Sequence, residues 1–248
     1  MLTGKELLHT LLRELEEMGQ PGMSATLDEM YRSPTFQELD PLTAIANLIE
    51  PAYETKMNKR ILSRLRSAHL RGCPQELSSC MDSAQRMYLP PGITQTLSTL
   101  DFIESGLNVC ILGPSDSGKS YLAKAIGIAA CHSYKVEYYH CEALLEELVA
   151  PKAEDYSKYQ KRLKRLCSIA LLILDDFLLH TITDEREVKI LFEILEKRCE
   201  INLSTMICSQ REPASWSAMI LNDEVSSNAI MKRATKHYTV VIKPLKSS

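Results

Sequence analysis

Residues 113–120, which read GPSDSGKS, have the residue types and spacing of a loop that binds nucleotide phosphates. Glycines allow backbone N–H groups to turn toward phosphate oxygens, and a helix that begins at such a loop adds a favourable dipole. In this pattern Lys119 contacts the β- and γ-phosphates and the Ser120 hydroxyl binds Mg²⁺. A glycine turn with no ligand is the alternative.

The flanking residues favour the phosphate-binding interpretation. An apolar run at 109–112 predicts a buried strand before the loop, and an amphipathic stretch at 121–131 predicts a helix after it. This strand–loop–helix context is what the motif requires. The residues expected to bind the nucleotide are Gly113, Pro114, Ser115, Asp116, Ser117, Gly118, Lys119, Ser120 and Tyr121.

A second candidate element lies at 171–176, where four apolar residues precede Asp175 and Asp176. The apolar run predicts a strand buried on both faces, and open α/β sheets bind ligands at the carboxyl ends of their strands. We expect Asp175 to hold Mg²⁺ through its water shell and Asp176 to orient an attacking water. Such a pattern is common at strand ends, but it is informative some fifty residues after a phosphate loop.

Three further residues are candidates. Ser209 and Gln210 end the next expected strand, where a polar side chain can sense the γ-phosphate; a strand-end turn is the alternative. Arg233 lies near the end of the last expected helix, from which it can reach a neighbouring subunit's nucleotide, because its planar cationic group suits phosphate oxygens. A solvated helix cation is the alternative for Arg233.

The elements around these residues alternate between strand and helix. Strands are expected at 109–112, 135–140, 169–175, 204–209 and 238–242, and helices at 93–105, 121–131, 143–149, 156–167, 185–200, 213–221 and 225–236. Alternation of this kind predicts an α/β fold with a parallel five-stranded sheet and helices on both faces.

The first part of the chain is expected to be helical. Thr3 and Glu6 form a capping-box pattern for a first helix, Ser24 is the expected cap of a short helix ending at Tyr31, and Thr35 with Glu38 forms a second capping box. Pro51 should break the following helix, kink it or start the next one. Turn residues at 72–92 then indicate a boundary between a helical domain, 1–75, and a core, 76–248.

Charge is unevenly distributed along the chain. Residues 1–55 hold three basic and ten acidic side chains, whereas residues 56–71 hold six basic ones and no acid. This basic block predicts contact with the phosphates of double-stranded DNA, with a solvated helix face as the alternative. The expected DNA-binding residues are Lys56, Lys59, Arg60, Arg64, Arg66 and Arg71, and a second basic cluster contains Lys158, Lys161, Arg162, Lys164 and Arg165.

Composition limits the class of protein. The chain has 248 residues, a net charge of −3 and a hydrophobic content of 45%, which suits one or two globular domains. It has no apolar run of 18 residues and no signal-peptide pattern, so we expect no membrane partner. Its eight cysteines form no C-x-x-C pair and are expected to be reduced thiols in the cytoplasm.

Taken together, these stretches resemble the IstB-like helper ATPases of insertion-sequence transposition. That family is close to the DnaC-type helicase loaders within the AAA+ ATPases, a class of P-loop NTPases. The resemblance covers roughly residue 35 to the end and depends on four stretches, namely NVCILGPSDSGKSYLAKAIGIAA, LLILDDFLLH, EREVKILFEILEKRCEINLSTMICSQ with a following tryptophan, and NAIMKRATKHYTVVI.

The resemblance implies an AAA+ core after a small helical domain, binding of ATP and Mg²⁺, homo-oligomers on double-stranded DNA, and work beside a transposase. It implies that Asp175 and Asp176 form the Walker B pair, that Ser209 or Gln210 is sensor 1, and that Arg233 is the arginine finger. The length after residue 242 leads us to expect no C-terminal lid. Asp116 departs from the commoner loop sequence and places a carboxylate near the phosphates.

Four functions are compatible with these features. The first is a DNA-dependent ATPase that assists a transposase in target capture, and the second is a DnaC-like loader of a replicative helicase. The third is a small-molecule kinase, which should have arginines in a mobile lid that we do not find in the sequence. The fourth is a scaffold that binds nucleotide without hydrolysing it.

Overall fold

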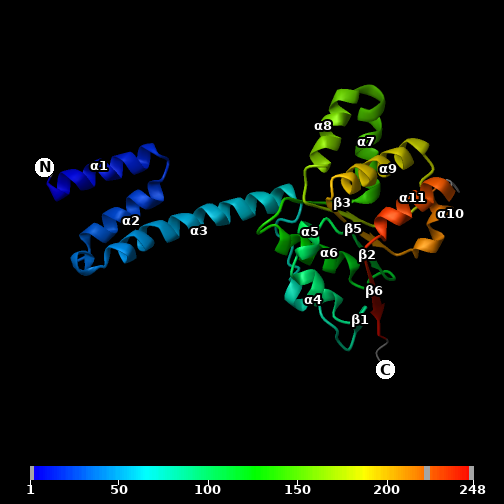
Figure 1. Cartoon of the computed structure of the whole chain (residues 1–248), viewed down its shortest axis with the longest axis horizontal. Coiled ribbons are helices and arrows are strands. Elements are labelled where there is room, and N and C mark those ends of the chain that lie inside the picture. Colours follow the sequence, from blue (N-terminus) through cyan, green and yellow to red (C-terminus); the bar gives the residue numbers. More distant parts are fainter. Residues whose placement is uncertain (1–2, 221–223, 246–248) are drawn as a thin grey trace. The chain divides into compact units, whose positions relative to one another are not determined.

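The computed structural model describes residues 3–220 and 224–245, which form two compact units that divide at Ser63 and Arg64 (Figure 1). This division lies inside a helix, earlier in the chain than the boundary near residue 75 that the turn residues indicated. The first unit contains α1 (Gly4–Glu17), α2 (Pro21–Arg32), the short 3₁₀ helix η1 (Phe36–Glu38) and most of α3 (Pro41–Ser67).

The capping prediction for α1 is confirmed. The Glu6 N–H donates to the Thr3 hydroxyl at 3.4 Å, and the Thr3 N–H donates to a Glu6 carboxylate oxygen at 2.7 Å. The prediction for Ser24 is wrong, because α2 already begins at Pro21, where the missing N–H of proline costs no helical bond. Ser24 instead lies inside α2, and its hydroxyl donates to the Leu12 carbonyl of α1 at 3.3 Å.

The capping box at Thr35 is also wrong. Residues after Thr35 form only η1, and α3 begins later, where the Asp40 carboxylate accepts N–H bonds from Leu42 at 3.1 Å and Thr43 at 3.2 Å. Pro51 interrupts nothing, since α3 runs continuously from Pro41 to Ser67. Pro51 is exposed, so the carbonyl that loses its helical partner one turn earlier can bind water.

The second unit is built on one sheet with strand order β1-β6-β2-β5-β4-β3. Five strands are parallel, as predicted, and a sixth, β1, is antiparallel to β6. The bounds are β1 (Arg86–Leu89), β2 (Val109–Leu112), β3 (Val136–His140), β4 (Leu171–Asp175), β5 (Ser204–Ser209) and β6 (Tyr238–Pro244). β1 was missed because it has only four residues inside a stretch rich in turn residues.

Helices cover both faces of this sheet and bury two separate apolar clusters against it. One face packs against α4 (Ile93–Ser98), α5 (Asp101–Glu104) and α6 (Lys119–Ala130). The other packs against α7 (Cys141–Glu154), α8 (Tyr156–Leu166), α9 (Glu185–Glu200), α10 (Trp216–Met219) and α11 (Glu224–Ala234). Two further 3₁₀ helices are η2 (Leu77–Ser79) and η3 (Pro213–Ser215).

Two expected helices differ in the structure. The helix at 93–105 is divided into α4 and α5, because Leu100 adopts a left-handed backbone with φ of 64°. The helix at 213–221 is reduced to η3 and α10, and its expected end falls outside the described residues. Five of the eight cysteines are buried in the core, as their apolar surroundings predicted.

Candidate functional site

The phosphate loop joins the buried strand β2 to α6 at the carboxyl edge of the sheet. Gly113 is required by close packing, because a Cβ at this position would lie 2.7 Å from the Ile242 carbonyl oxygen and from the Ser117 hydroxyl. Gly118 has φ of 100°, a conformation that L side chains rarely adopt, and a Cβ there would collide with the Arg86 guanidinium. The loop conformation therefore requires glycine at both positions.

Lys119 begins α6 and is almost fully buried, with 6% of its surface exposed. Its ammonium donates a hydrogen bond to the Pro114 carbonyl at 2.7 Å, which folds the side chain across its own loop. Burial lowers the pKa of Lys119, and the nearby Asp175 and Asp176 carboxylates act in the opposite direction. A buried cation that is hydrogen-bonded to a neutral carbonyl is suited to bind phosphate oxygens.

Asp175 ends β4 and is fully buried. Its Oδ2 accepts a short hydrogen bond from the Tyr138 hydroxyl of β3, and its Oδ1 accepts the Asp176 N–H at 3.0 Å. Burial is the main reason that the pKa of Tyr138 lies far above its ordinary value, and the bond to Asp175 adds to this rise. The tyrosine therefore remains a proton donor that orients the carboxylate.

Asp176 is more accessible and has a left-handed backbone with φ of 52°. Its Oδ2 lies 3.0 Å from His140 Nδ1 at the end of β3, and about a third of its side chain is exposed. β3 therefore contacts both aspartates of the pair through Tyr138 and His140. These two residues are two positions apart, so their side chains lie on the same face of the strand.

Most of the predicted residues meet at one pocket of about 390 Å³. It is lined by Arg86, Ser115, Asp116, Gly118, Lys119, Ser120, Tyr121, Asp176 and Gln210. Four of the residues predicted to bind the nucleotide or Mg²⁺ are not among those that line it, namely Gly113, Pro114, Ser117 and the fully buried Asp175.

The structure distinguishes the two candidate sensors. The Ser209 hydroxyl is buried, donates to the Phe177 carbonyl at 2.8 Å and accepts the Arg211 N–H at 3.1 Å. Gln210, by contrast, lines the pocket. Ser209 thus fixes the turn after β5, and Gln210 is the residue placed to contact a ligand.

Arg233 on α11 does not line the pocket of its own chain. Its guanidinium pairs with Glu196 of α9, donates to the Ala229 carbonyl at 2.8 Å and lies 4.9 Å from the Phe192 ring centroid. About a quarter of the side chain remains exposed. Within one chain, Arg233 therefore has a structural contact with α9.

The predicted DNA-binding cations also differ in environment. Arg64 donates to the Cys131 carbonyl at 3.2 Å and the His132 carbonyl at 2.6 Å, at the carboxyl end of α6, where a cation is favoured by the helix dipole. The other five side chains are exposed, and they are Lys56, Lys59, Arg60, Arg66 and Arg71.

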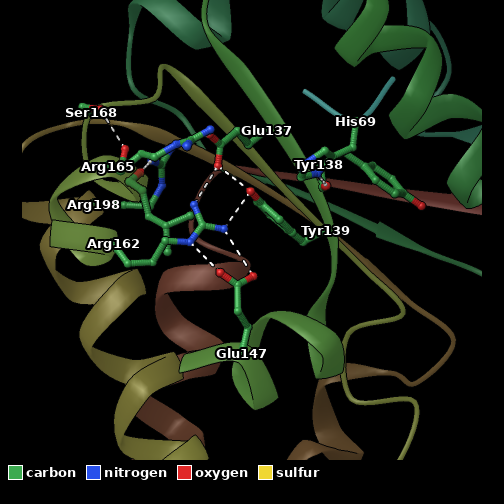
Figure 2. Close-up of polar contacts among 10 residues, drawn as sticks. His69, Glu137, Tyr138, Tyr139, Glu147, Arg162, Arg165, Ser168 and Arg198 are labelled. Carbon is green, nitrogen blue, oxygen red and sulfur yellow. Dashed lines mark hydrogen bonds and ion pairs between the residues drawn. The ribbon is translucent and has the colours of Figure 1, made fainter. Parts of the chain in front are cut away.

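Two members of the second basic cluster, Arg162 and Arg165, form ion pairs within the chain (Figure 2). Glu137 of β3 is almost fully buried and accepts bonds from Arg165 at 2.8 Å and Arg162 at 3.4 Å. Arg162 also donates to Glu147 at 2.9 Å and to the Tyr139 hydroxyl at 2.8 Å. Arg165 remains 57% exposed despite its ion pair, and the other exposed cations of α8 are Lys158, Lys161 and Lys164.

The residues of the pocket fit a nucleotide with Mg²⁺. The left-handed Gly118 backbone and the N-terminus of the 12-residue helix α6 form a cradle for anionic oxygens. Ser120 lines the pocket and Asp175 is buried next to the lining residue Asp176; both have the hard oxygen atoms that Mg²⁺ prefers, and they would hold the ion. No helix within residues 3–220 and 224–245 combines the length and apolar character that a membrane span requires.

Comparison with known proteins decides the family. The model of the IstB-like ATP binding protein family matches residues 13–246. The chain belongs to this IstB-like family. This membership makes it an ATP-binding protein of insertion-sequence type, with the AAA+ fold.

Two relatives illustrate the likeness. The insertion sequence ATP-binding protein y4uH of Sinorhizobium fredii is 33% identical over 228 residues, which is 92% of this chain and 89% of the relative. The insertion sequence IS232 ATP-binding protein of Bacillus thuringiensis is 35% identical over 144 residues, which is 58% of this chain and 56% of the relative.

Solved structures share the fold of this IstB-like chain at low identity. The DnaC helicase loader aligns with a TM-score of 0.52 and 19% identity, covering 69% of this chain and 98% of that one. The replication initiator DnaA bound to AMPPCP and single-stranded DNA aligns with a TM-score of 0.56 and 17% identity, covering 69% of this chain and 50% of that one.

Sequence reasoning missed three residues of this IstB-like site. Arg86 lies in the unpredicted strand β1, so no motif pointed to it. Tyr138 and His140 lie in a predicted strand, and their signal was alternation, since residues two apart share one face of a strand. Only the pairing of β3 with β4 identifies that face as the one near the aspartates.

Proposed function

We propose that this chain hydrolyses ATP while assembled as a homo-oligomer on double-stranded DNA, and that it assists a transposase in capturing the target for insertion-sequence transposition. The observation that supports it is the convergence of Lys119, Ser120, Asp176 and Gln210 on one pocket in a chain of the IstB-like family. Their positions match the parts that an ATPase needs to bind phosphate and orient water.

In this proposal, each pocket residue has a distinct task. Lys119 exchanges the Pro114 carbonyl for phosphate oxygens, which bond more strongly to a cation than a neutral carbonyl does. Ser120 and Asp175 would hold Mg²⁺, which would supply positive charge next to the phosphates. Asp176 accepts a hydrogen bond from the attacking water, and Gln210 donates its amide to the terminal phosphate.

Arg233 is proposed to act on the nucleotide of a neighbouring subunit. It is absent from the lining of its own pocket, and it retains partial exposure on α11. To reach a neighbour, its guanidinium must exchange the Glu196 carboxylate for phosphate, which preserves a charge-assisted bond. Hydrolysis would therefore depend on assembly.

DNA contact is proposed for the exposed cations. Their side chains are free to neutralise backbone phosphates, which gives affinity without sequence readout. They comprise Lys56, Lys59, Arg60, Arg66 and Arg71, and the lysines of α8 are the next candidates.

A transposase is the proposed partner because the relatives carry insertion-sequence names over most of their length. The likeness to the DnaC loader is a likeness of fold and does not favour a helicase. With DNA and ATP as ligands, we place the protein in the cytoplasm.

The test is ATP hydrolysis measured with and without linear duplex DNA. The native chain should hydrolyse ATP faster with DNA, and Asp176→Asn should bind ATP normally while hydrolysis falls by roughly 10²-fold or more. Hydrolysis by Asp176→Asn at the native rate would contradict the assignment. Absence of hydrolysis in the native chain, with ATP still bound, would instead indicate a nucleotide-binding scaffold.

A further inference from the structure

Arg86 is a pocket residue that belongs to none of the motifs. It begins β1, the antiparallel edge strand, where its backbone faces Pro244 of β6. The Arg86 carbonyl accepts the Ser83 N–H at 2.9 Å, and the Arg86 N–H donates to the Ser83 hydroxyl at 3.3 Å. These bonds fix the point from which the side chain extends to the phosphate loop.

The guanidinium lies directly against the loop. A Cβ added at Gly118 would collide with Arg86 Nη1, so the cation occupies the space beside this glycine. Arg86 also lines the same pocket as Lys119 and Ser120. The cation is therefore placed at the loop that binds phosphate, although Arg86 lies 32 residues before Gly118 in the chain.

Arg86 has no ion-pair partner within the described ranges, 3–220 and 224–245. Its side chain is nevertheless only partly exposed. The second basic cluster provides a contrast, since Arg162 and Arg165 both pair with Glu137, and Arg162 also pairs with Glu147 (Figure 2). A partly desolvated guanidinium without a carboxylate is suited to an anionic ligand.

The charges that line the pocket explain why a second cation is needed beside Lys119. Two carboxylates, Asp116 and Asp176, and two cations, Arg86 and Lys119, line it. Asp116 lies within the loop itself, at φ of 59°, and would repel the phosphates. A second fixed cation offsets that repulsion.

We propose that Arg86 binds the phosphates of the nucleotide within its own chain, from the β1 side of the loop. The planar guanidinium would donate two parallel bonds to phosphate oxygens, an arrangement that a lysine cannot reproduce. This role rests on the proposed function of the pocket as the ATP site. It is distinct from that of Arg233, which is proposed to act on a neighbouring subunit.

The test is calorimetric titration of the full chain with ATP and with ADP, without DNA. Arg86→Gln should bind both nucleotides about tenfold or more weakly, because charge-assisted bonds are lost. Arg186→Gln is the matched control, because Arg186 is an exposed arginine outside the pocket and outside the proposed DNA-binding residues, and this variant should bind nucleotide like the native chain. The melting temperature of each unliganded variant is measured alongside.

Lys119→Ala in the same assay separates two failures. If Lys119→Ala binds weakly and Arg86→Gln binds normally, the role of Arg86 is wrong while the pocket remains the ATP site. If both bind normally, the pocket is not the ATP site and the proposed function also fails.

The variant Arg86→Lys, which keeps the charge, distinguishes phosphate binding by Arg86 from a purely structural role. Affinity that recovers in part in Arg86→Lys relative to Arg86→Gln, whatever the two melting temperatures, would support the proposal, because lysine restores the charge but not the two parallel bonds. Affinity that follows the melting temperature across the two variants and not the charge would overturn it.

Discussion

Replacing Tyr138 with phenylalanine tests how the Mg²⁺-binding carboxylate is held. Tyr138 is 6% exposed, and its hydroxyl donates to Oδ2 of Asp175, which is fully buried. The other oxygen of Asp175 accepts the Asp176 N–H at 3.0 Å. Phenylalanine keeps the ring, and with it the contact to Lys124 at 4.9 Å, so the change removes one donor and little packing.

The expected cost follows from the burial of the carboxylate. Hydrogen bonds to charged groups contribute about 1.5–3 kcal/mol, and a buried acceptor that loses its donor has no water to replace it. We therefore expect Tyr138→Phe to lower the free energy of unfolding by about 1.5–3 kcal/mol in urea denaturation. Tyr134→Phe is the matched control: its hydroxyl donates to the exposed Glu104 at 2.7 Å, so its loss should cost less than half as much.

The functional result should appear in the dependence on Mg²⁺. A carboxylate that is no longer oriented binds the ion less well, so half-maximal ATP hydrolysis should require several-fold more Mg²⁺. Nucleotide binding without Mg²⁺ should be unchanged, because Tyr138 does not line the pocket. Native stability together with native Mg²⁺ dependence would refute the positioning role of Tyr138.

Three other predictions address the remaining parts of the site. Lys119→Ala should lower ATP affinity in titration calorimetry by at least tenfold, because it removes a charge-assisted contact, and native affinity would show that the loop is not the nucleotide site. A mixture of Arg233→Ala and Asp176→Asn chains should recover part of the hydrolysis that each has lost; co-assembly without recovery would refute action between subunits. Glutamine at four exposed cations should weaken binding to unrelated DNA duplexes about equally. The slope of log affinity against log salt concentration should shrink by up to about 0.9 per lost contact. If affinity and slope are both unchanged, these cations do not contact DNA, and the lysines of α8 are the next candidates. The four substituted cations are Lys56, Lys59, Arg60 and Arg66.

The sequence alone determined the parts of this protein that depend on local patterns. The strand–loop–helix unit around residues 113–120 and the buried strand before Asp175 were predictable because phosphate-binding loops and buried parallel strands need few residue types at fixed spacing. The five parallel strands followed from alternation of strand and helix. The capping box at Thr3 was predictable for the same local reason.

Tertiary structure decided which polar side chains meet. Arg86 of β1, His140 of β3 and Gln210 just after β5 reach the phosphate loop and its aspartates, and no spacing in the sequence reports which strands are neighbours. Ser209 and Gln210 are adjacent in the sequence, yet only the turn after β5 buries one and directs the other toward the pocket. The physical reason is that a hydrogen bond or ion pair acts over a few ångströms in space, and the sheet brings together residues that the chain separates by thirty or more positions.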